Sequence, residues 1–212
     1  MAPKRRLGLV LFALAGAVSL HAVSQAATSP PPAPGQPVFS LAPEEVLGNP
    51  QAKVTVIEYA SAACPHCARV NNEVIPAFKK KYVDTGKVRY VFRELLTDPV
   101  PFAGTAFMMA RCAGESKYFD VLNDVFQQQT AIYQSGDLSG GLLKIGAKYG
   151  MDKDKLNACM DEKAVDALNA RVEKANKDGV DSTPTFIIAG NKSVGEKSLD
   201  DLSAAIDPLL AK

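Results

Sequence analysis

The sequence predicts an α/β protein whose central mixed β-sheet is interrupted by an inserted all-helical domain. An apolar, strand-like run over residues 54–59 leads into a helix-like run over 64–83 and then into a second strand over 88–92. From 98 to 179 the apolar spacing is purely helical, and strand-like sequence resumes at 185–188. Because a strand–helix–strand unit forms a right-handed crossover between parallel strands, the outer segments are expected to build one sheet.

The first 26 residues have the features of a secretory signal peptide. Lys4, Arg5 and Arg6 precede an apolar run over 7–20, and Ser24-Gln25-Ala26 forms a small-x-small cleavage site. An uncleaved anchor is the alternative, although the apolar run is short for a membrane span. Cleavage removes three basic residues and no acidic one, which changes the formal charge from +1 to −2. Neither nucleic acid nor a charged membrane surface is therefore expected as a partner.

Composition divides the chain into five expected segments. The run over 30–37 is rich in proline and lacks core-forming residues, which favours a stiff, extended tether. The stretch over 38–52 has room for an edge strand and a turn, but not for a dimerisation domain. The expected segments are a signal peptide (1–26), a tether (27–45), the first part of a sheet-containing domain (46–97), a helical insertion (98–179) and the second part of that domain (180–212).

Local signals place the helices in order. Pro76 lies in the middle of the helix over 64–83 and is expected to kink it. Asp152 is expected to cap a helix, and Gly150 to end the one before it. The expected insertion helices cover Ala103–Ala113, Lys117–Gln129, Leu142–Tyr149, a segment after Asp152, and Ala164–Lys177, and a closing helix covers Ser198–Leu210.

The candidate chemistry centres on Cys64-Pro65-His66-Cys67, where the first helix begins. Two thiols with two residues between them can close a small disulfide ring. Cys64 would face the unpaired N–H groups and the positive end of the helix, which favour a thiolate, and a protonated His66 would favour it further. Because a more stable thiolate makes the disulfide more oxidising, the motif indicates a donor of disulfides. The alternative is a purely structural bridge.

Glu58 ends an apolar face of the first strand, six residues before Cys64. It shares that face with Val54 and Val56 because side chains alternate along a strand. A partly buried carboxylate there could accept or deliver protons during disulfide exchange, whereas the alternative is a solvated acid at the end of a strand. Arg89 and Arg93 are candidates to balance its charge.

The other two cysteines, Cys112 and Cys159, lie on two different predicted helices of the insertion. In an oxidising compartment four cysteines most simply form two disulfides, which leaves these two for each other. Such a bridge would close a long loop and stabilise the fold by roughly 3–4.7 kcal/mol in the chain-entropy account. Two buried, unpaired cysteines are the alternative.

Four short motifs in combination resemble a known family. They are Leu47-Gly48-Asn49-Pro50, Val56-Ile57-Glu58-Tyr59 followed by the Cys-Pro-His-Cys motif, Val91-Phe92-Arg93-Glu94, and Ser182-Thr183-Pro184-Thr185-Phe186. Together they resemble the DsbA family of bacterial thiol:disulfide oxidoreductases, in which a thioredoxin fold carries an inserted helical domain. The resemblance spans roughly residues 46–210.

The resemblance implies roles for the residues of the motif. Cys64 would be the exposed nucleophile and Cys67 its buried partner, with Pro65 and His66 completing the catalytic motif. Glu58 matches the position of the family's buried acid. No cofactor or metal is expected. By resemblance the chain would be a periplasmic monomer that oxidises reduced exported polypeptides, and a DsbB-type membrane protein would reoxidise it.

The resemblance also extends to the segment before the later strand. Pro184 would form a cis peptide bond and lie beside the cysteines, and the backbone of Thr183 would pair with a substrate chain. The Cys112–Cys159 pair resembles a second bridge found in some members. Threonine before this proline is also common in the family's isomerases and reductases, which are usually oligomers. A disulfide isomerase or reductase is therefore the first alternative.

A metal carrier that uses the vicinal cysteines is the second alternative. His21 leaves with the predicted signal peptide, so His66 is the only histidine of the expected mature chain. One chain therefore cannot supply two cysteines and two histidines to a zinc ion, and there is no second Cys-x-x-Cys motif for a four-cysteine site. Haem attachment is also not expected, because Ala68 and not histidine follows Cys67.

Overall fold

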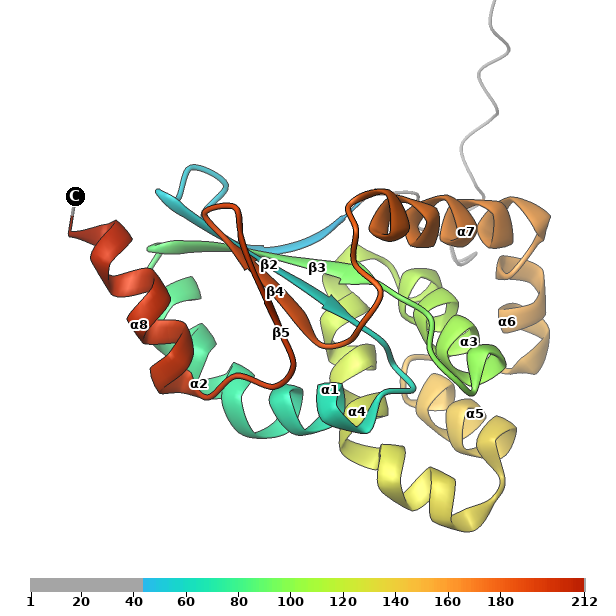
Figure 1. The fold of residues 1–212 in the computed structure, drawn as a ribbon. Coiled ribbons are helices and arrows are strands. Elements are labelled where there is room, and N and C mark those ends of the chain that lie inside the picture. The colour runs from blue at the N-terminus through green and yellow to red at the C-terminus, as the bar shows by residue number, and fades with distance from the viewer. Residues whose placement is uncertain (1–43, 212) are drawn as a thin grey trace, which may run out of the picture. The chain divides into compact units, whose positions relative to one another are not determined.

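The computed structural model describes residues 44–211, and every structural statement below concerns these residues (Figure 1). The predicted signal peptide and residues 27–43 of the predicted tether lie outside them. No helix within 44–211 is both long and apolar enough to cross a membrane.

Five strands form one mixed sheet in the order β1-β3-β2-β4-β5. Only β2 and β3 are parallel, as expected for a strand–helix–strand crossover, and the other neighbours are antiparallel. The first strand begins at Glu45, so it takes up the last residue of the predicted tether. The strands are β1 (Glu45–Gly48), β2 (Val54–Ala60), β3 (Val88–Glu94), β4 (Thr185–Ile188) and β5 (Asn191–Val194).

The helical path after β2 is less regular than predicted. It consists of α1 (Pro65–Arg69), a π-helical turn (Val70–Val74), α2 (Ile75–Phe78) and a second π-helical turn (Lys79–Val83). Pro76 has no N–H to donate to the preceding turn. The wider turn directly before α2 accommodates this missing donor, which is a common place for a π-helical turn.

The insertion contains five helices joined by short connections. Asp137, Asp152 and Asp161 cap three of them, because each side chain accepts a hydrogen bond from a backbone N–H in the first turn. The helices are α3 (Val100–Cys112), α4 (Tyr118–Ser135), α5 (Leu138–Lys148), α6 (Lys153–Cys159) and α7 (Glu162–Lys177), with a 3₁₀ turn over Glu115–Lys117.

Two insertion helices differ most from their predicted ends. The helix predicted to end at Gln129 continues to Ser135, where Gly136 adopts a left-handed conformation. The next helix begins at Leu138 and not at Leu142. The cap at Asp137 stabilises its first turn and compensates for the low helix propensity of its glycines. Gly141 packs so tightly that a Cβ there would lie 2.7 Å from the Ile132 side chain. The absence of a side chain at Gly141 therefore lets α4 and α5 approach closely.

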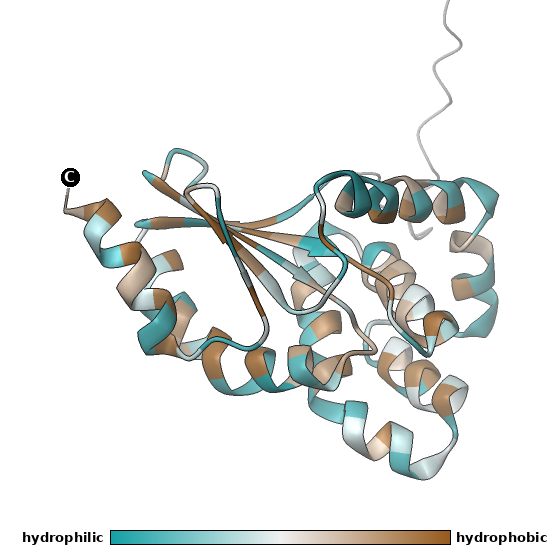
Figure 2. Cartoon of the chain, in the orientation of Figure 1, coloured by the Kyte–Doolittle hydropathy of each residue, from teal (hydrophilic) through white to brown (hydrophobic). Residues whose placement is uncertain are grey.

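Helices cover both faces of the sheet. Figure 1 shows α1, α2 and α8 (Leu199–Leu210) on one side and α7 on the other. Ser198 forms a capping box with Asp201 at the start of α8. Figure 2 shows apolar residues along the central strands and mixed polar and apolar residues along the insertion helices. One contiguous cluster of buried residues joins the sheet to the insertion, so the thiol motif at their junction rests on a packed base.

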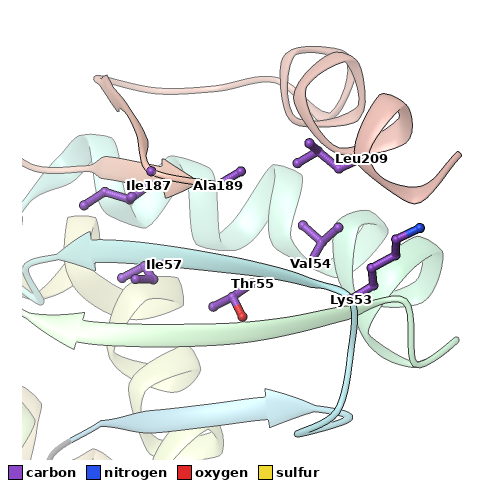
Figure 3. Close-up of a pocket in the computed structure, with 8 residues that line it drawn as sticks. Lys53, Val54, Thr55, Ile57, Ile187, Ala189 and Leu209 are labelled. Carbon is purple, nitrogen blue, oxygen red and sulfur yellow. The ribbon is translucent and has the colours of Figure 1, made fainter. Parts of the chain in front are cut away.

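A pocket of about 370 Å³ lies over β2 and β4 beside the end of α8 (Figure 3). Thr55, Ile57 and Ile187 supply much of its wall, and Leu209 closes one side. None of the predicted site residues lines this pocket. The candidate site therefore has to be sought at the other end of β2, where the cysteines lie.

Candidate active site

Cys64 lies where the chain leaves β2 and enters α1. It has an extended backbone conformation, and Pro65 follows at the first position of the helix, where its missing N–H costs no hydrogen bond. The residue is 7% exposed and Cys67 is 1% exposed. The prediction of an exposed nucleophile is therefore wrong in degree. The Thr183 carbonyl oxygen lies 3.5 Å from the Cys64 sulfur, so the segment before β4 shields it.

The environment of Cys64 favours its thiolate. Hydrogen bonding from Cys67 is the largest of several effects that lower the pKa of Cys64 to about 5, against the opposing effect of burial. The side chain of Thr183 and the backbone N–H groups of Cys67 and His66 also lower the pKa of Cys64. These backbone donors belong to the first turn of α1, where N–H groups have no partner within the helix.

Cys67 is the opposite member of the pair. Burial, followed by its hydrogen bond to Cys64 and the charge of Cys64, raises the pKa of the Cys67 thiol strongly. At neutral pH Cys64 is therefore the thiolate, and Cys67 is the thiol that donates a hydrogen bond to it. Both cysteines are in the dithiol form. An asymmetric pair of this kind has one sulfur that leaves easily and one that needs a proton to leave.

Glu58 is buried beneath the thiols, with 2% of its surface exposed, so it is not a solvated acid at the end of a strand. Its Oε2 atom accepts a hydrogen bond of 2.6 Å from the hydroxyl of Tyr90 on β3. Burial raises the pKa of Glu58 to about 7, the hydrogen bond from Tyr90 opposes that rise, and the charge of Cys64 adds to it. The carboxyl group can therefore gain and lose a proton near neutral pH.

The expectation that Arg89 and Arg93 balance Glu58 is wrong. In the parallel register of β2 and β3, Arg89 is opposite Thr55 and Arg93 is opposite Tyr59. Side chains at these positions point to the face away from Glu58. The two arginines instead bind acidic groups at the other face and edge of the sheet, among them Glu44 and Asp178.

The imidazole of His66 contacts charged side chains other than the thiols. Its Nδ1 atom contacts the carboxylate of Glu196, in the loop before α8, and lies 2.6 Å from a guanidinium nitrogen of Arg69. The side chain is 59% exposed. The group of His66 that favours the Cys64 anion is thus its backbone N–H, whereas the sequence indicated its imidazole.

The segment before β4 completes the site. The Thr183–Pro184 peptide bond is cis, and the Thr183 carbonyl oxygen is the group already described beside the Cys64 sulfur. A second cis bond, Asp98–Pro99, precedes α3 and had no counterpart in the sequence prediction. The pairing of a substrate chain with the Thr183 backbone stays a prediction.

Two residues of α4 hold the loop before Cys64, and sequence reasoning missed both. Gln129 donates from its Nε2 atom to the carbonyl oxygens of Ala62 and Cys64, at 2.7 and 3.3 Å, and the Tyr133 hydroxyl donates to that of Ala63 at 2.9 Å. Gln129 is only 1% exposed. A signal was present, because Gln129 continues the apolar helical stripe of Leu122 and Phe126, where a polar side chain needs a buried partner.

A disulfide joins Cys112 on α3 to Cys159 on α6, with a Cα–Cα distance of 6.0 Å. It lies within the insertion and does not belong to the thiol site. Within residues 44–211, no three histidine, cysteine, aspartate or glutamate side chains gather in a way that could hold a metal ion.

Comparison with known proteins places this arrangement in a family. A family model described as thioredoxin matches residues 41–208. A Rickettsia felis protein named as a protein-disulfide oxidoreductase is 34% identical over 168 residues, which cover 78% of this chain and 59% of that protein. The chain therefore spans about three fifths of the length of the first curated relatives that it matches.

Solved structures give the same assignment. Alpha-DsbA1 of Wolbachia pipientis is similar with a TM-score of 0.71 and 31% identity, covering 85% of this chain and 93% of that chain. BdbD from Bacillus subtilis has a TM-score of 0.64 at 21% identity, which supports the fold alone. The sequence and structural similarities agree with the geometry of the two thiols. The chain therefore belongs to the thioredoxin family and, within it, to the DsbA-like thiol:disulfide oxidoreductases.

Proposed function

We propose that this chain is a thiol:disulfide oxidoreductase that donates its Cys64–Cys67 disulfide to reduced polypeptides. One observation carries the proposal: the surroundings lower the pKa of Cys64 to about 5 and raise that of Cys67. Stabilising the thiolate of the reduced form makes the corresponding disulfide a stronger oxidant. The asymmetry also defines the direction of attack, because Cys64 is the less enclosed of the two sulfurs.

The proposed reaction has two thiol–disulfide exchanges. A substrate thiolate attacks the Cys64 sulfur, the Cys64–Cys67 bond breaks, and the Cys67 sulfur leaves and takes a proton. A second substrate thiolate then attacks the substrate sulfur of the mixed disulfide and expels Cys64 as a stable thiolate. The substrate loses two electrons and gains a disulfide, and the protein ends as the dithiol.

Glu58 is the group that we propose to supply the proton that Cys67 needs. The two groups interact electrostatically, since the charge of Glu58 raises the pKa of Cys67 further. A carboxyl group whose pKa is about 7 can give a proton when the disulfide breaks and take one when it forms again. We therefore assign Cys64, Cys67 and Glu58 to the chemistry, and Thr183 and Pro184 to substrate binding.

The compartment and partners follow from the family and from the predicted signal peptide. The proposed substrates are reduced exported polypeptides in the periplasm, and the proposed reoxidant is a membrane protein of the DsbB type. The proposed oligomeric state is a monomer, as the resemblance to the family's oxidases implies.

The test is equilibration of the mature protein with glutathione buffers of known ratio, followed by trapping of the thiols. We expect a reduction potential well above that of thioredoxin, which is about −270 mV. Replacing Cys64 with serine is the control and must remove the redox transition. A potential close to that of thioredoxin would contradict donation of disulfides as the function.

A second measurement separates the oxidase from an isomerase. A monomeric oxidase should oxidise a dithiol peptide quickly and restore little activity to scrambled ribonuclease. Efficient recovery of ribonuclease activity, together with a dimer or trimer by light scattering, would instead assign the chain to the isomerases of the same fold.

A further inference from the structure

The hydrogen bond between Tyr90 and Glu58 connects a buried carboxyl group to a neutral partner. Both residues are buried, with 3% and 2% of their surfaces exposed, and the O–O distance is 2.6 Å. Buried carboxylates are usually paired with a cation or satisfied by several donors. The hydroxyl of Tyr90 is the side-chain donor that the structure gives Glu58.

The ring of Tyr90 is held in place by two other aromatic side chains. Its centroid lies 5.7 Å from that of Phe78 on α2 and 6.3 Å from that of Phe119 on α4. Edge-on and tilted contacts of this kind fix the ring plane and hence the direction of the hydroxyl. Tyr90 is thus restrained from both sides of the junction between the sheet and the insertion.

We propose that Tyr90 is a positioning residue whose neutral hydrogen bond holds Glu58 ready to exchange a proton with the Cys67 sulfur. This inference rests on the proposed oxidoreductase function and deepens it. When the Cys64–Cys67 bond breaks, Glu58 releases its proton, the Cys67 sulfur takes it, and Glu58 remains as a carboxylate that Tyr90 stabilises. When the disulfide forms again, the proton returns from Cys67 to Glu58 as the Cys67 sulfur attacks.

The neutral character of the donor is what suits this role. A lysine or arginine in contact with Glu58 would keep it ionised, so that it could not supply a proton. Without any donor, burial would keep it protonated. Burial raises the pKa of Tyr90 well above its usual value, so Tyr90 remains a neutral donor throughout the working range. The titratable groups that face this pair are Cys64, Cys67 and, beside Tyr90, Tyr118.

The first test is a carboxyl titration by carbon-13 NMR of the reduced full chain, with Tyr90→Phe compared to the unmodified protein. The phenylalanine keeps the ring contacts and removes the donor. We expect the midpoint of Glu58 to move upward by about one pH unit, because the ionised form loses its hydrogen bond. An unchanged midpoint would overturn the proposal.

Tyr82→Phe is the matched control. The Tyr82 hydroxyl also donates to a carboxylate at 2.6 Å, that of Asp207 on α8, and its ring also lies 5.7 Å from Phe78. This variant removes an equally short hydrogen bond away from the thiols. We expect the Glu58 midpoint to stay where it is in the unmodified protein, and a comparable shift in both variants would overturn the specific role of Tyr90.

The second test is the rate at which Cys67 resolves a mixed disulfide of Cys64 with glutathione, measured from pH 5 to 9. Glu58 must be ionised to accept the Cys67 proton, so the pH–rate profile should bend at the pKa of Glu58. Because Tyr90→Phe should raise that pKa, it should lower the rate about tenfold below pH 7 and move the bend to higher pH. Glu58→Gln should remove the bend, and adding Tyr90→Phe to it should change nothing further. A further tenfold loss in that double variant would show a merely structural effect and overturn the proposal.

These measurements keep the two proposals separate. If the unmodified protein does not oxidise a dithiol peptide, the proposed function fails, whatever the titration shows. If it does oxidise the peptide but Tyr90→Phe leaves the titration and the pH profile unchanged, the function stands and the role of Tyr90 fails.

Discussion

At the scale of single residues, the two thiols and the one carboxyl group of the site have very different pKa values. Cys64 is stabilised as an anion by donors, Cys67 is kept protonated by burial, and Glu58 titrates near neutral pH. The pKa of each group depends on a different balance between burial and hydrogen bonding. Reactivity here is therefore a property of the surroundings of each group and not of its residue type.

The shifted carboxyl group makes stability depend on pH in a defined direction. The pKa of Glu58 rises from 4.5 to about 7 on folding, so its contribution to stability is complete below pH 4.5 and is lost as pH rises through about 7. Glu58→Gln should therefore raise the free energy of unfolding of the reduced protein by roughly 2–3 kcal/mol at pH 8. At pH 4 the two proteins should be alike within experimental error.

The measurement is urea unfolding of the reduced protein at both pH values. Glu73→Gln is a suitable control, because it neutralises an exposed acid on the same helical segment as the cysteines. A loss of stability at pH 8 on replacing Glu58 would mean that its carboxylate is stabilising, contrary to the raised pKa.

At the scale of secondary-structure elements, helix α4 supports the loop that leads into Cys64. Gln129 and Tyr133 donate to three successive carbonyl groups of that loop, those of residues 62, 63 and 64. A helix of the insertion therefore orients a loop of the sheet domain. The two parts of the chain also share one cluster of buried residues.

Removing the Gln129 amide should loosen this loop. Gln129→Leu leaves the carbonyls of Ala62 and Cys64 without this donor, which should lower the free energy of unfolding by about 1–3 kcal/mol. The Cys64 titration followed by thiolate absorbance should broaden or move upward, since the first turn of α1 is held less firmly. Gln127→Leu changes an exposed glutamine on the same helix and should do neither. Equal effects of the two substitutions would contradict the role of Gln129.

Local sequence patterns predicted more of the elements than of their contacts. The strand over 54–59, the start of α1 and the cap at Asp152 depend on neighbouring residues and were predicted. The predicted partners of Glu58, Arg89 and Arg93, were wrong because the sequence does not show which face of the sheet each residue of β3 occupies. That choice depends on the register of β2 against β3, which no local pattern contains. Gln129 was missed for the same reason, since its partners lie 65 and 67 residues away.

At the scale of the whole molecule, one buried carboxylate joins the sheet to three helices of the insertion. Glu94 ends β3 and is 2% exposed. It accepts hydrogen bonds from Arg111 on α3 at 2.6 Å, from Tyr118 on α4 at 3.0 Å and from Arg171 on α7 at 2.5 Å. The insertion is thus attached to the sheet by a charged centre as well as by apolar packing.

Glu94→Gln tests whether this centre holds the two parts together. The glutamine keeps the size of the side chain but leaves two largely buried guanidinium groups without their shared carboxylate, and breaking a buried ion pair on one side costs about 3–5 kcal/mol. We expect the free energy of unfolding to fall by that order. Since the loop before Cys64 depends on α4, we also expect the rate of peptide oxidation to fall. Glu173→Gln, which breaks an exposed pair with Lys177 on α7, should change stability by less than about 1 kcal/mol. If the two substitutions cost the same, apolar packing alone attaches the insertion, and the charged centre is dispensable.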